Sequence, residues 1–179
     1  MVDDFIKRMK AAFPDFANKL VESPQVGLEQ VRPPISEVDL NKLETSLGLQ
    51  LPESYKSFLR CARQFWLFGG IVQFGTQHPF FHEFEPFDKL PPKQQLFVKQ
   101  RSGRWPPPSQ GMLCFAEFFM EADGDQVLFD VSKGLVNDEY PIMYYDHETP
   151  SVRRLADTLS QFLTEFLDYP AFALEGDFE

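Results

Sequence analysis

The stretch that most constrains the fold of this chain is residues 35–70, which carry signals for two helices joined by a tight corner. Ser36 occupies the position of an N-cap, and Asp39 follows three residues later, where a capping box places its acidic partner. Leucines then recur at spacings of three and four residues, and Gly48 can adopt the left-handed conformation that ends many helices. The sequence therefore predicts a first helix between the Ser36 cap and Gly48.

A second helix is predicted to begin at Pro52, because proline is tolerated at a first helical position, and to end at Gly69 and Gly70. Its apolar face would consist of Tyr55, Phe58, Leu59, Ala62 and Trp66. Two short helices with this much apolar surface are unstable alone, so the rest of the chain must supply a packing partner.

The N-terminal residues 1–24 predict a helical arm that Pro14 breaks into two pieces. Its apolar stripe consists of Phe5, Met9, Ala12, Phe16 and Leu20. At 179 residues, with 43% hydrophobic residues and 20 Phe, the chain fits one domain with a substantial core. Residues 170–179 predict a solvated acidic tail.

Charge and cysteine content restrict the class of protein. A net charge of -10 opposes binding to nucleic acid or to an anionic membrane surface, and it favours a basic partner. Apolar runs are too short to span a bilayer and no signal-peptide pattern is visible, so a cytoplasmic protein is expected. Cys61 and Cys114 lie within apolar patterns, and both are expected to be free.

Extended patterns replace helical ones after Gly70. Short strands are predicted at residues 71–74, 80–84 and 141–145, and a hairpin pairs residues 112–119 with 125–131. The hairpin turn would contain Asp123 and Gly124, because Asp-Gly suits a type I′ turn. Residues 112–119 are apolar on both faces, as in a central strand covered on both sides, whereas residues 126–131 alternate.

A closing helix is predicted with Thr149 as its cap and Pro150 as its first residue, ending near Tyr169. Its core face would consist of Val152, Leu155, Leu159, Phe162, Leu163 and Phe166. The predicted fold class is therefore α+β: a single domain in which N-terminal helices and one C-terminal helix wrap a mixed, mostly antiparallel sheet.

Residues 86–108 form a proline-rich basic segment, and its middle, residues 93–101, fits a short helix or an edge strand equally well. Arg101, Arg104 and Trp105 could stack on nucleic-acid bases or dock into a proline-reading groove. A solvated loop or a protein contact is favoured, because an isolated basic patch on so acidic a protein binds nucleic acid weakly.

Three segments together resemble the SUKH superfamily, which includes yeast cell-wall assembly regulators and bacterial toxin-immunity proteins. They are ISEVDLNKLETSLGLQLPESYKSFL, the hairpin FAEFF…GDQVLFDVS, and YPIMYYDHET followed by a terminal helix. The resemblance covers residues 30–168, with departures at ARQFWLFGG and at residues 86–108. It implies an α+β fold and protein binding without catalysis, which in bacteria usually means neutralising a cognate toxin domain, often a nuclease.

Two groups of residues, one of histidines and one of aspartates, could suggest metal sites. His78 and His82, with neighbouring glutamates, invite a metal, but on a strand their side chains would lie about 13 Å apart, so surface histidines are favoured. Asp123, Asp125 and Asp130 lack the order of a calcium loop, and a turn explains them.

Asp146, His147 and Glu148 could form an acid-base set with a nucleophile elsewhere in the chain. The sequence contains no G-x-S-x-G elbow and no glycine-rich phosphate loop, and Cys114 lies in a predicted buried strand. A polar turn between strand and helix is the simpler interpretation. We therefore expect a protein that is not an enzyme and uses no cofactor.

The first functional hypothesis is an immunity protein whose partner is a basic toxin domain. Its candidate partner-binding residues are Asp123, Asp125, Asp146, His147, Glu148 and Trp105. The alternative is a regulatory scaffold, like the cell-wall regulators, whose N-terminal arm and proline-rich segment recruit other proteins.

Overall fold

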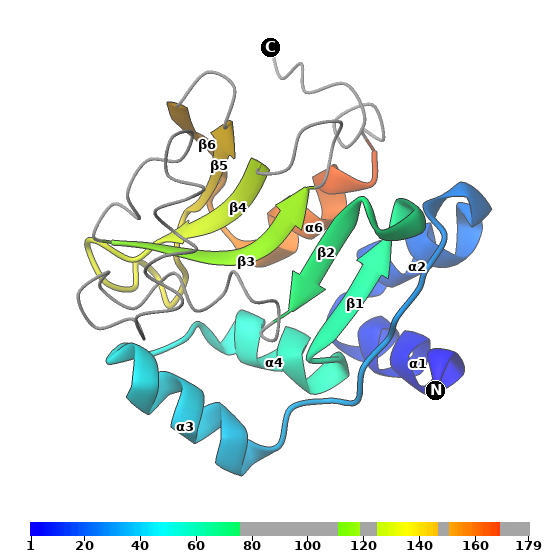
Figure 1. The fold of residues 1–179 in the computed structure, drawn as a ribbon, viewed down its shortest axis with the longest axis horizontal. Coiled ribbons are helices and arrows are strands. Elements are labelled where there is room, and N and C mark those ends of the chain that lie inside the picture. The colour runs from blue at the N-terminus through cyan, green and yellow to red at the C-terminus, as the bar shows by residue number, and fades with distance from the viewer. Residues whose placement is uncertain (76–110, 119–124, 147–150, 169–179) are drawn as a thin grey trace, which may run out of the picture.

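A computed structural model describes residues 1–75, 111–118, 125–146 and 151–168 of the chain (Figure 1). The N-terminal half contains the helices α1 (Val2–Ala12), α2 (Pro14–Glu22), α3 (Glu37–Leu47) and α4 (Glu53–Cys61) and the 3₁₀ turn η1 (Pro24–Val26). The strands are β1 (Gln64–Leu67), β2 (Val72–Gly75), β3 (Met112–Phe118), β4 (Asp125–Asp130), β5 (Ile142–Asp146) and β6 (Ser151–Ala156). The 3₁₀ turn η2 (Phe68–Gly70) lies between β1 and β2, and α6 (Leu159–Phe166) follows β6.

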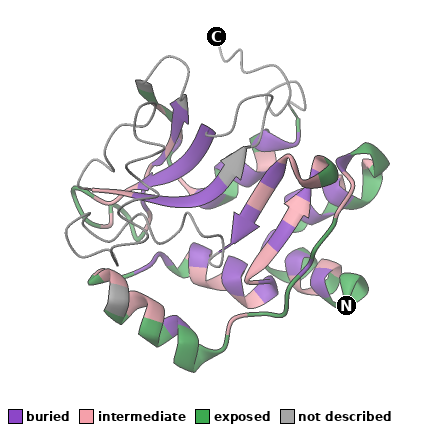
Figure 2. Ribbon diagram, viewed as in Figure 1, coloured by how far each residue is buried: buried purple, intermediate pink, exposed green. Residues whose placement is uncertain are grey.

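The six strands form one antiparallel sheet whose order in space equals their order in sequence, β1 to β6. Helices α1, α2, α4 and α6 pack on the same face of this sheet, and the core lies between the two layers (Figures 1 and 2). This arrangement confirms the predicted α+β class. None of the described helices is both long and apolar enough to cross a membrane.

Aromatic rings fill the core between the helices and the sheet. The ring of Phe65 on β1 stacks on that of Phe74 on β2, with centroids 5.0 Å apart. From the helical layer, Phe58 approaches Phe65 to 5.4 Å and Phe5 approaches it to 5.0 Å. All four side chains are 0% exposed. Stacked and tilted ring contacts of this kind add to the gain from apolar burial.

The predicted start and end of α3 are confirmed. The Asp39 amide donates to the Ser36 hydroxyl oxygen at 3.1 Å, and that hydroxyl donates to the Asp39 carboxylate at 2.8 Å. Gly48 ends the helix with φ +65°, a left-handed conformation that glycine adopts without steric cost. This cap depends only on residues within one turn, and a sequence pattern can therefore predict it.

The predicted second helix is too long at its C-terminal end. Helix α4 has Pro52 as its N-cap and ends at Cys61, and Trp66 lies on strand β1. Phe65 and Leu67 alternate with half-buried residues, and β1 pairs with β2 through Phe65 opposite Phe74. Pairing with a strand that follows in the chain therefore outweighs the helical spacing of the apolar residues.

The start of the predicted closing helix is also wrong. Residues 151–156 form β6, which pairs with β5 from Ser151 opposite Asp146 to Ala156 opposite Ile142. Helix α6 starts later, where the Thr158 hydroxyl accepts a hydrogen bond from the Gln161 amide at 3.1 Å. Four of its predicted core residues, Leu159, Phe162, Leu163 and Phe166, are buried on α6. The other two, Val152 and Leu155, lie on β6 instead, and Val152 is 40% exposed. The predicted cap at Thr149 and Pro150 lies outside the described residues.

The N-terminal prediction of two helical pieces that meet at Pro14 is confirmed. Phe5, Met9 and Phe16 are buried in the same cluster as the residues of the sheet, whereas Ala12 is exposed. Lys19 on α2 donates to the carbonyl of Thr164 on α6 at 2.7 Å. The first two helices therefore contribute directly to the core.

The predicted β3–β4 hairpin is confirmed by its antiparallel register, which shifts at Phe115 between Cys114 and Ala116. On the face of the sheet opposite the main core, Cys114, Leu128 and Tyr145 form a second buried cluster. Gln126 is 6% exposed, so the alternation along β4 does not mark a solvent face. Both cysteines are free and buried, as predicted. The predicted turn, the 80–84 strand, residues 86–108 and the acidic tail lie outside the described residues.

Candidate binding surface

Asp125 is the candidate partner-binding residue whose side chain the structure describes. It is the first residue of β4, is 7% exposed, and accepts a hydrogen bond from the Tyr144 hydroxyl. The guanidinium of Arg153 on β6 lies 5.1 Å from the centre of the Tyr144 ring. The Asp125 carboxylate therefore connects β4 to Tyr144 on β5, and the Tyr144 ring in turn contacts Arg153 on β6.

The other candidate residues stay predictions. Asp146 is the last residue of β5, opposite Ser151, and the backbone alone is described there. Asp123, His147, Glu148 and Trp105 lie outside the described residues. Residues 147–150 connect β5 to β6, so His147 and Glu148 belong to the connection at this end of the β5–β6 pair.

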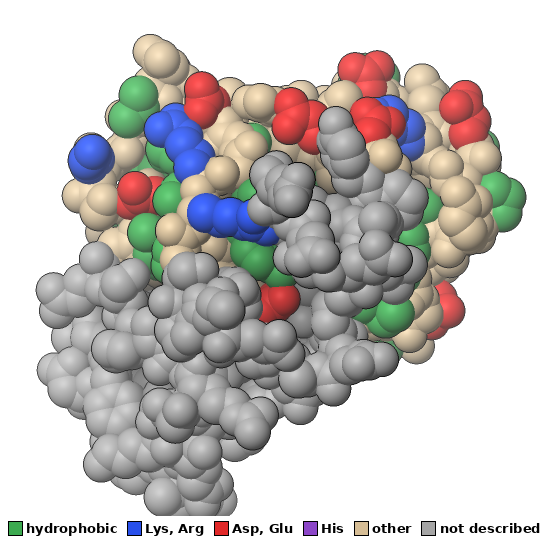
Figure 3. Space-filling model, turned by 90° about the horizontal axis from the view of Figure 1, so that it is seen from above, with side chains coloured by type: hydrophobic (Ala, Val, Ile, Leu, Met, Phe, Trp, Pro, Cys, Tyr) green, Lys and Arg blue, Asp and Glu red, His purple; other side chains and the backbone are tan. Residues whose placement is uncertain are grey.

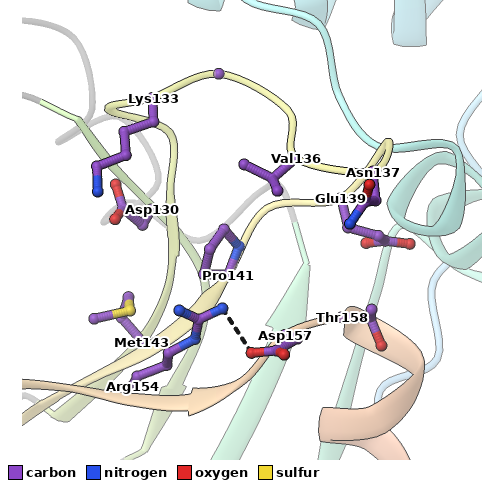
Figure 4. A pocket seen from close by; sticks show the side chains of 11 residues that line it. Asp130, Lys133, Val136, Asn137, Glu139, Pro141, Met143, Arg154, Asp157 and Thr158 are labelled. Atoms are coloured by element: carbon purple, nitrogen blue, oxygen red, sulfur yellow. Dashed lines mark ion pairs between the residues drawn. The ribbon is translucent and has the colours of Figure 1, made fainter.

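A pocket of about 300 Å³ opens at the opposite end of β5 (Figure 4). The end of β4 and residues 131–141, which join β4 to β5, form one side of it, and the end of β6 and the turn from β6 to α6 form the other. Its charged and amide side chains are Asp130, Lys133, Asn137, Glu139, Arg154 and Asp157, and Val136, Pro141 and Met143 supply apolar surface. Sequence reasoning did not predict this pocket.

The 131–141 loop is built on a tight turn. Val136 and Glu139 exchange two backbone hydrogen bonds of 2.8 and 3.1 Å. Between them, Asn137 and Asp138 have φ values of +52° and +62°. Positive φ at both central residues is characteristic of a type I′ turn, and Asn and Asp tolerate it better than other non-glycine residues. The Asn-Asp pair is thus a sequence signal from which this turn could have been predicted.

Two hydrogen bonds attach this loop to α4 and to the segment just before it. The Ser54 hydroxyl donates to the Glu139 carboxylate at 2.8 Å, and the Tyr140 hydroxyl donates to the Gln50 carbonyl at 2.8 Å. Tyr140 is 3% exposed, and burial raises its pKa above the ordinary value. Because the loop is fixed at its turn and along one side, its exposed side chains are held in position before any partner arrives.

Charges of both signs surround the pocket. Arg154 on β6 pairs with Asp157 at 2.6 Å, with side chains 56% and 73% exposed, and Figure 4 marks this ion pair. Asp130 accepts from the Ser132 amide at 3.0 Å. Seen from above, Lys and Arg side chains gather on the side of the molecule where β5 and β6 lie, with acidic side chains among them (Figure 3). Exposed pairs of this kind contribute little to stability, so a partner can replace them at low cost.

The described cysteines are poorly suited to nucleophilic chemistry. Burial raises the pKa of Cys61 to about 11, and the Cys114 side chain is 1% exposed. Within residues 1–75, 111–118, 125–146 and 151–168, no group of three or more His, Cys, Asp or Glu side chains could hold a metal ion. The histidines considered for a metal, His78 and His82, lie outside these ranges.

Comparison with known proteins adds one finding. The sequence model of the SMI1/KNR4 family (SUKH-1) matches residues 34–165. The match spans well over half of the chain, from the residues before α3 to near the end of α6, and it leaves α1 and α2 outside. A search of curated proteins finds no match.

Proposed function

Because the chain belongs to the SMI1/KNR4 family (SUKH-1), we propose that it is a non-enzymatic protein-binding module that acts as an immunity protein. Its partner would be a toxin domain with a basic surface, which it neutralises by occluding that surface. The family description alone leaves room for a regulatory role, so the proposal depends on the shape and charge of the candidate surface.

The observation that carries this proposal is the exposed, fixed loop of residues 131–141 beside β6. The loop is held by its own tight turn and by hydrogen bonds from Ser54 and Tyr140. Val136 at the edge of the pocket remains 52% exposed. A few side chains supply most of the binding energy of an interface. Side chains that are already held in place lose less conformational entropy on binding, and the exposed side chains of this loop meet that condition.

Asp146, one of the predicted acidic residues, ends β5 at the far end of β6 from the pocket, whereas Asp125 is only 7% exposed. Strand β6 runs from the connection that contains Glu148 to the pocket that contains Asp157. Its six residues span about 17 Å at the usual rise of a strand. A partner with an interface of ordinary size, about 800 Å² on each side, would cover both ends. We propose that Asp146 and Glu148 contact basic residues of the toxin at one end and that Val136 contacts it at the other.

The first test is co-purification with the protein encoded beside this gene, followed by a toxicity assay with and without the chain. We expect a stable complex, and we expect association to slow at least tenfold between about 50 and 500 mM salt if charge steers the encounter. Failure to recover or neutralise a neighbouring toxin would contradict the immunity function. Association that is insensitive to salt would rule out the acidic residues as its driver.

The second test locates the surface. Val136→Asp should weaken binding to the toxin at least tenfold without changing the unfolding midpoint, because it places a charge in a buried contact. Val38→Asp is the matched control, since Val38 is 63% exposed on α3, which contributes no residue to the pocket lining. Equal affinities of the two variants would show that the loop lies outside the interface.

A further inference from the structure

The two edges of the sheet differ in whether their outer backbone groups are hydrogen-bonded. At the β1 edge, the Trp66 amide donates to the Glu29 carbonyl at 2.8 Å, and the Glu29 amide donates to the Trp66 carbonyl at 2.9 Å. The Arg32 amide adds a bond of 2.8 Å to the Gln64 carbonyl. The extended segment before α3 therefore closes this edge with backbone hydrogen bonds.

Strand β6 is the opposite edge and pairs with β5 along one side (Figure 1). In the part of the chain that the structure describes, no strand pairs with its other side. Val152 is 40% exposed and the Arg154 side chain is 56% exposed, so solvent reaches this edge. An edge strand of six residues presents backbone donors and acceptors that an extended peptide can pair with.

We propose that β6 binds an extended segment of a partner protein as a seventh strand, and that this segment carries acidic side chains opposite Arg153 and Arg154. This proposal rests on the proposed protein-binding function and specifies how part of the partner is held. Main-chain hydrogen bonds would supply affinity, and the two arginines would select the charge of the added strand.

The same two arginines argue against a second copy of this chain as the occupant. Two copies of β6 related by a twofold axis pair antiparallel, with each residue opposite a counterpart of the same sequence. A register centred on the strand places Arg153 of one copy opposite Arg154 of the other. Like charges directly opposite each other destabilise a strand pair.

Charged edge residues also protect a sheet from unspecific pairing, and the register shift between Ile142 and Met143 adds to this protection. Protection and selection are compatible here. Arginines that repel a basic or identical strand attract an acidic one, which is how a charged interface distinguishes partners.

The test uses synthetic peptides and the full chain, so it does not require the toxin. The probes are the acetylated, amidated peptides TVEEVVT and TVKKVVT, whose adjacent charges lie on both faces of a strand as Arg153 and Arg154 do, with binding measured by titration calorimetry and by hydrogen exchange. We expect the acidic peptide to bind at least tenfold more tightly than the basic one, and to slow amide exchange in residues 151–156 but not in residues 64–67. Equal binding of the two peptides, or protection outside β6, would overturn the proposal.

Charge reversal provides the second measurement. The double variant Arg153→Glu, Arg154→Glu should prefer the basic peptide, whereas Lys7→Glu, Lys10→Glu should behave like the original protein. This control makes the same change in net charge at exposed positions of α1. An unchanged preference in the β6 variant would overturn the proposal.

A third probe leaves the protein unaltered. The acidic peptide with N-methyl groups on all of its internal amides should lose its binding, because it cannot donate to β6 along either edge of the peptide. Unreduced binding would exclude strand addition. A wild-type dimer whose β6 amides become protected as concentration rises would show that a second copy occupies the edge. If the peptides bind as expected but no toxin is recovered, the strand-addition site stands and the immunity function fails.

Discussion

Replacing Phe5 by Ala should destabilise this protein as severely as a cavity in the middle of the sheet, although Phe5 lies outside the residues that match the family. The Phe5 side chain is 0% exposed, and its ring centre lies 5.0 Å from that of Phe65. Phe65 in turn stacks on Phe74. Removal of the Phe5 ring would therefore leave a cavity against the aromatic layer on β1 and β2.

The expected loss is about 3–5 kcal/mol, the usual cost of truncating a buried phenylalanine to alanine. Such a loss is a large share of the total stability of a single domain, which is about 5–15 kcal/mol. In a double-mutant cycle with Phe65→Ala, the two changes should be coupled by about 0.5–1.5 kcal/mol, because they remove the same ring contact.

Urea unfolding followed by tryptophan fluorescence and circular dichroism measures these free energies. Val2→Ala is the control on the same helix, since Val2 is 47% exposed, and it should change stability by less than about 0.5 kcal/mol. A loss below about 1 kcal/mol for Phe5→Ala would show that α1 contributes little to the folded core in solution. Deletion of residues 1–24 should likewise impair folding.

Three further predictions concern single groups. Ser36→Ala should cost about 1 kcal/mol of stability in urea unfolding, because it removes the cap of α3. Hydrogen bonds from the Arg60 guanidinium lower the pKa values of Glu37 and Glu53 below the ordinary 4.5. The two carboxylates therefore stabilise the folded protein above pH 4.5, and this stabilisation is lost as the pH falls through the lowered pKa values. Arg60→Gln should flatten this part of the curve of unfolding midpoint against pH. Cys61 should react with a thiol reagent at pH 8 far more slowly in the folded protein than in urea, because burial raises its pKa to about 11; equal rates would contradict this.

Features that depend on neighbours in the sequence could be predicted, and those that depend on distant pairing could not. The cap at Ser36, the end at Gly48 and the β3–β4 hairpin each involve residues close in the chain. Strand β1 was mistaken for helix because Tyr55, Phe58, Leu59, Ala62 and Trp66 also fit helical spacing. Only pairing with β2 distinguishes the two, and periodicity contains no information about it.

The C-terminal error has the same origin. A capping pattern at Thr149 and Pro150 precedes residues that fit a helix, yet residues 151–156 complete the sheet and the cap that forms is Thr158. The pocket was missed for a related reason. Its lining comes mainly from the β4–β5 loop, the β6–α6 turn and the strand ends beside them, which the fold brings together and the sequence keeps apart.

The backbone bonds from Glu29 and Arg32 have a consequence for assembly. Uncontrolled growth of a fibre through strand stacking requires that every molecule present two complementary ends. Among the described residues, the first strand is already covered by the molecule's own preceding segment, so an added strand can pair only beyond β6. Growth by this route therefore stops after one addition, and the protein can accept a guest strand without starting a polymer.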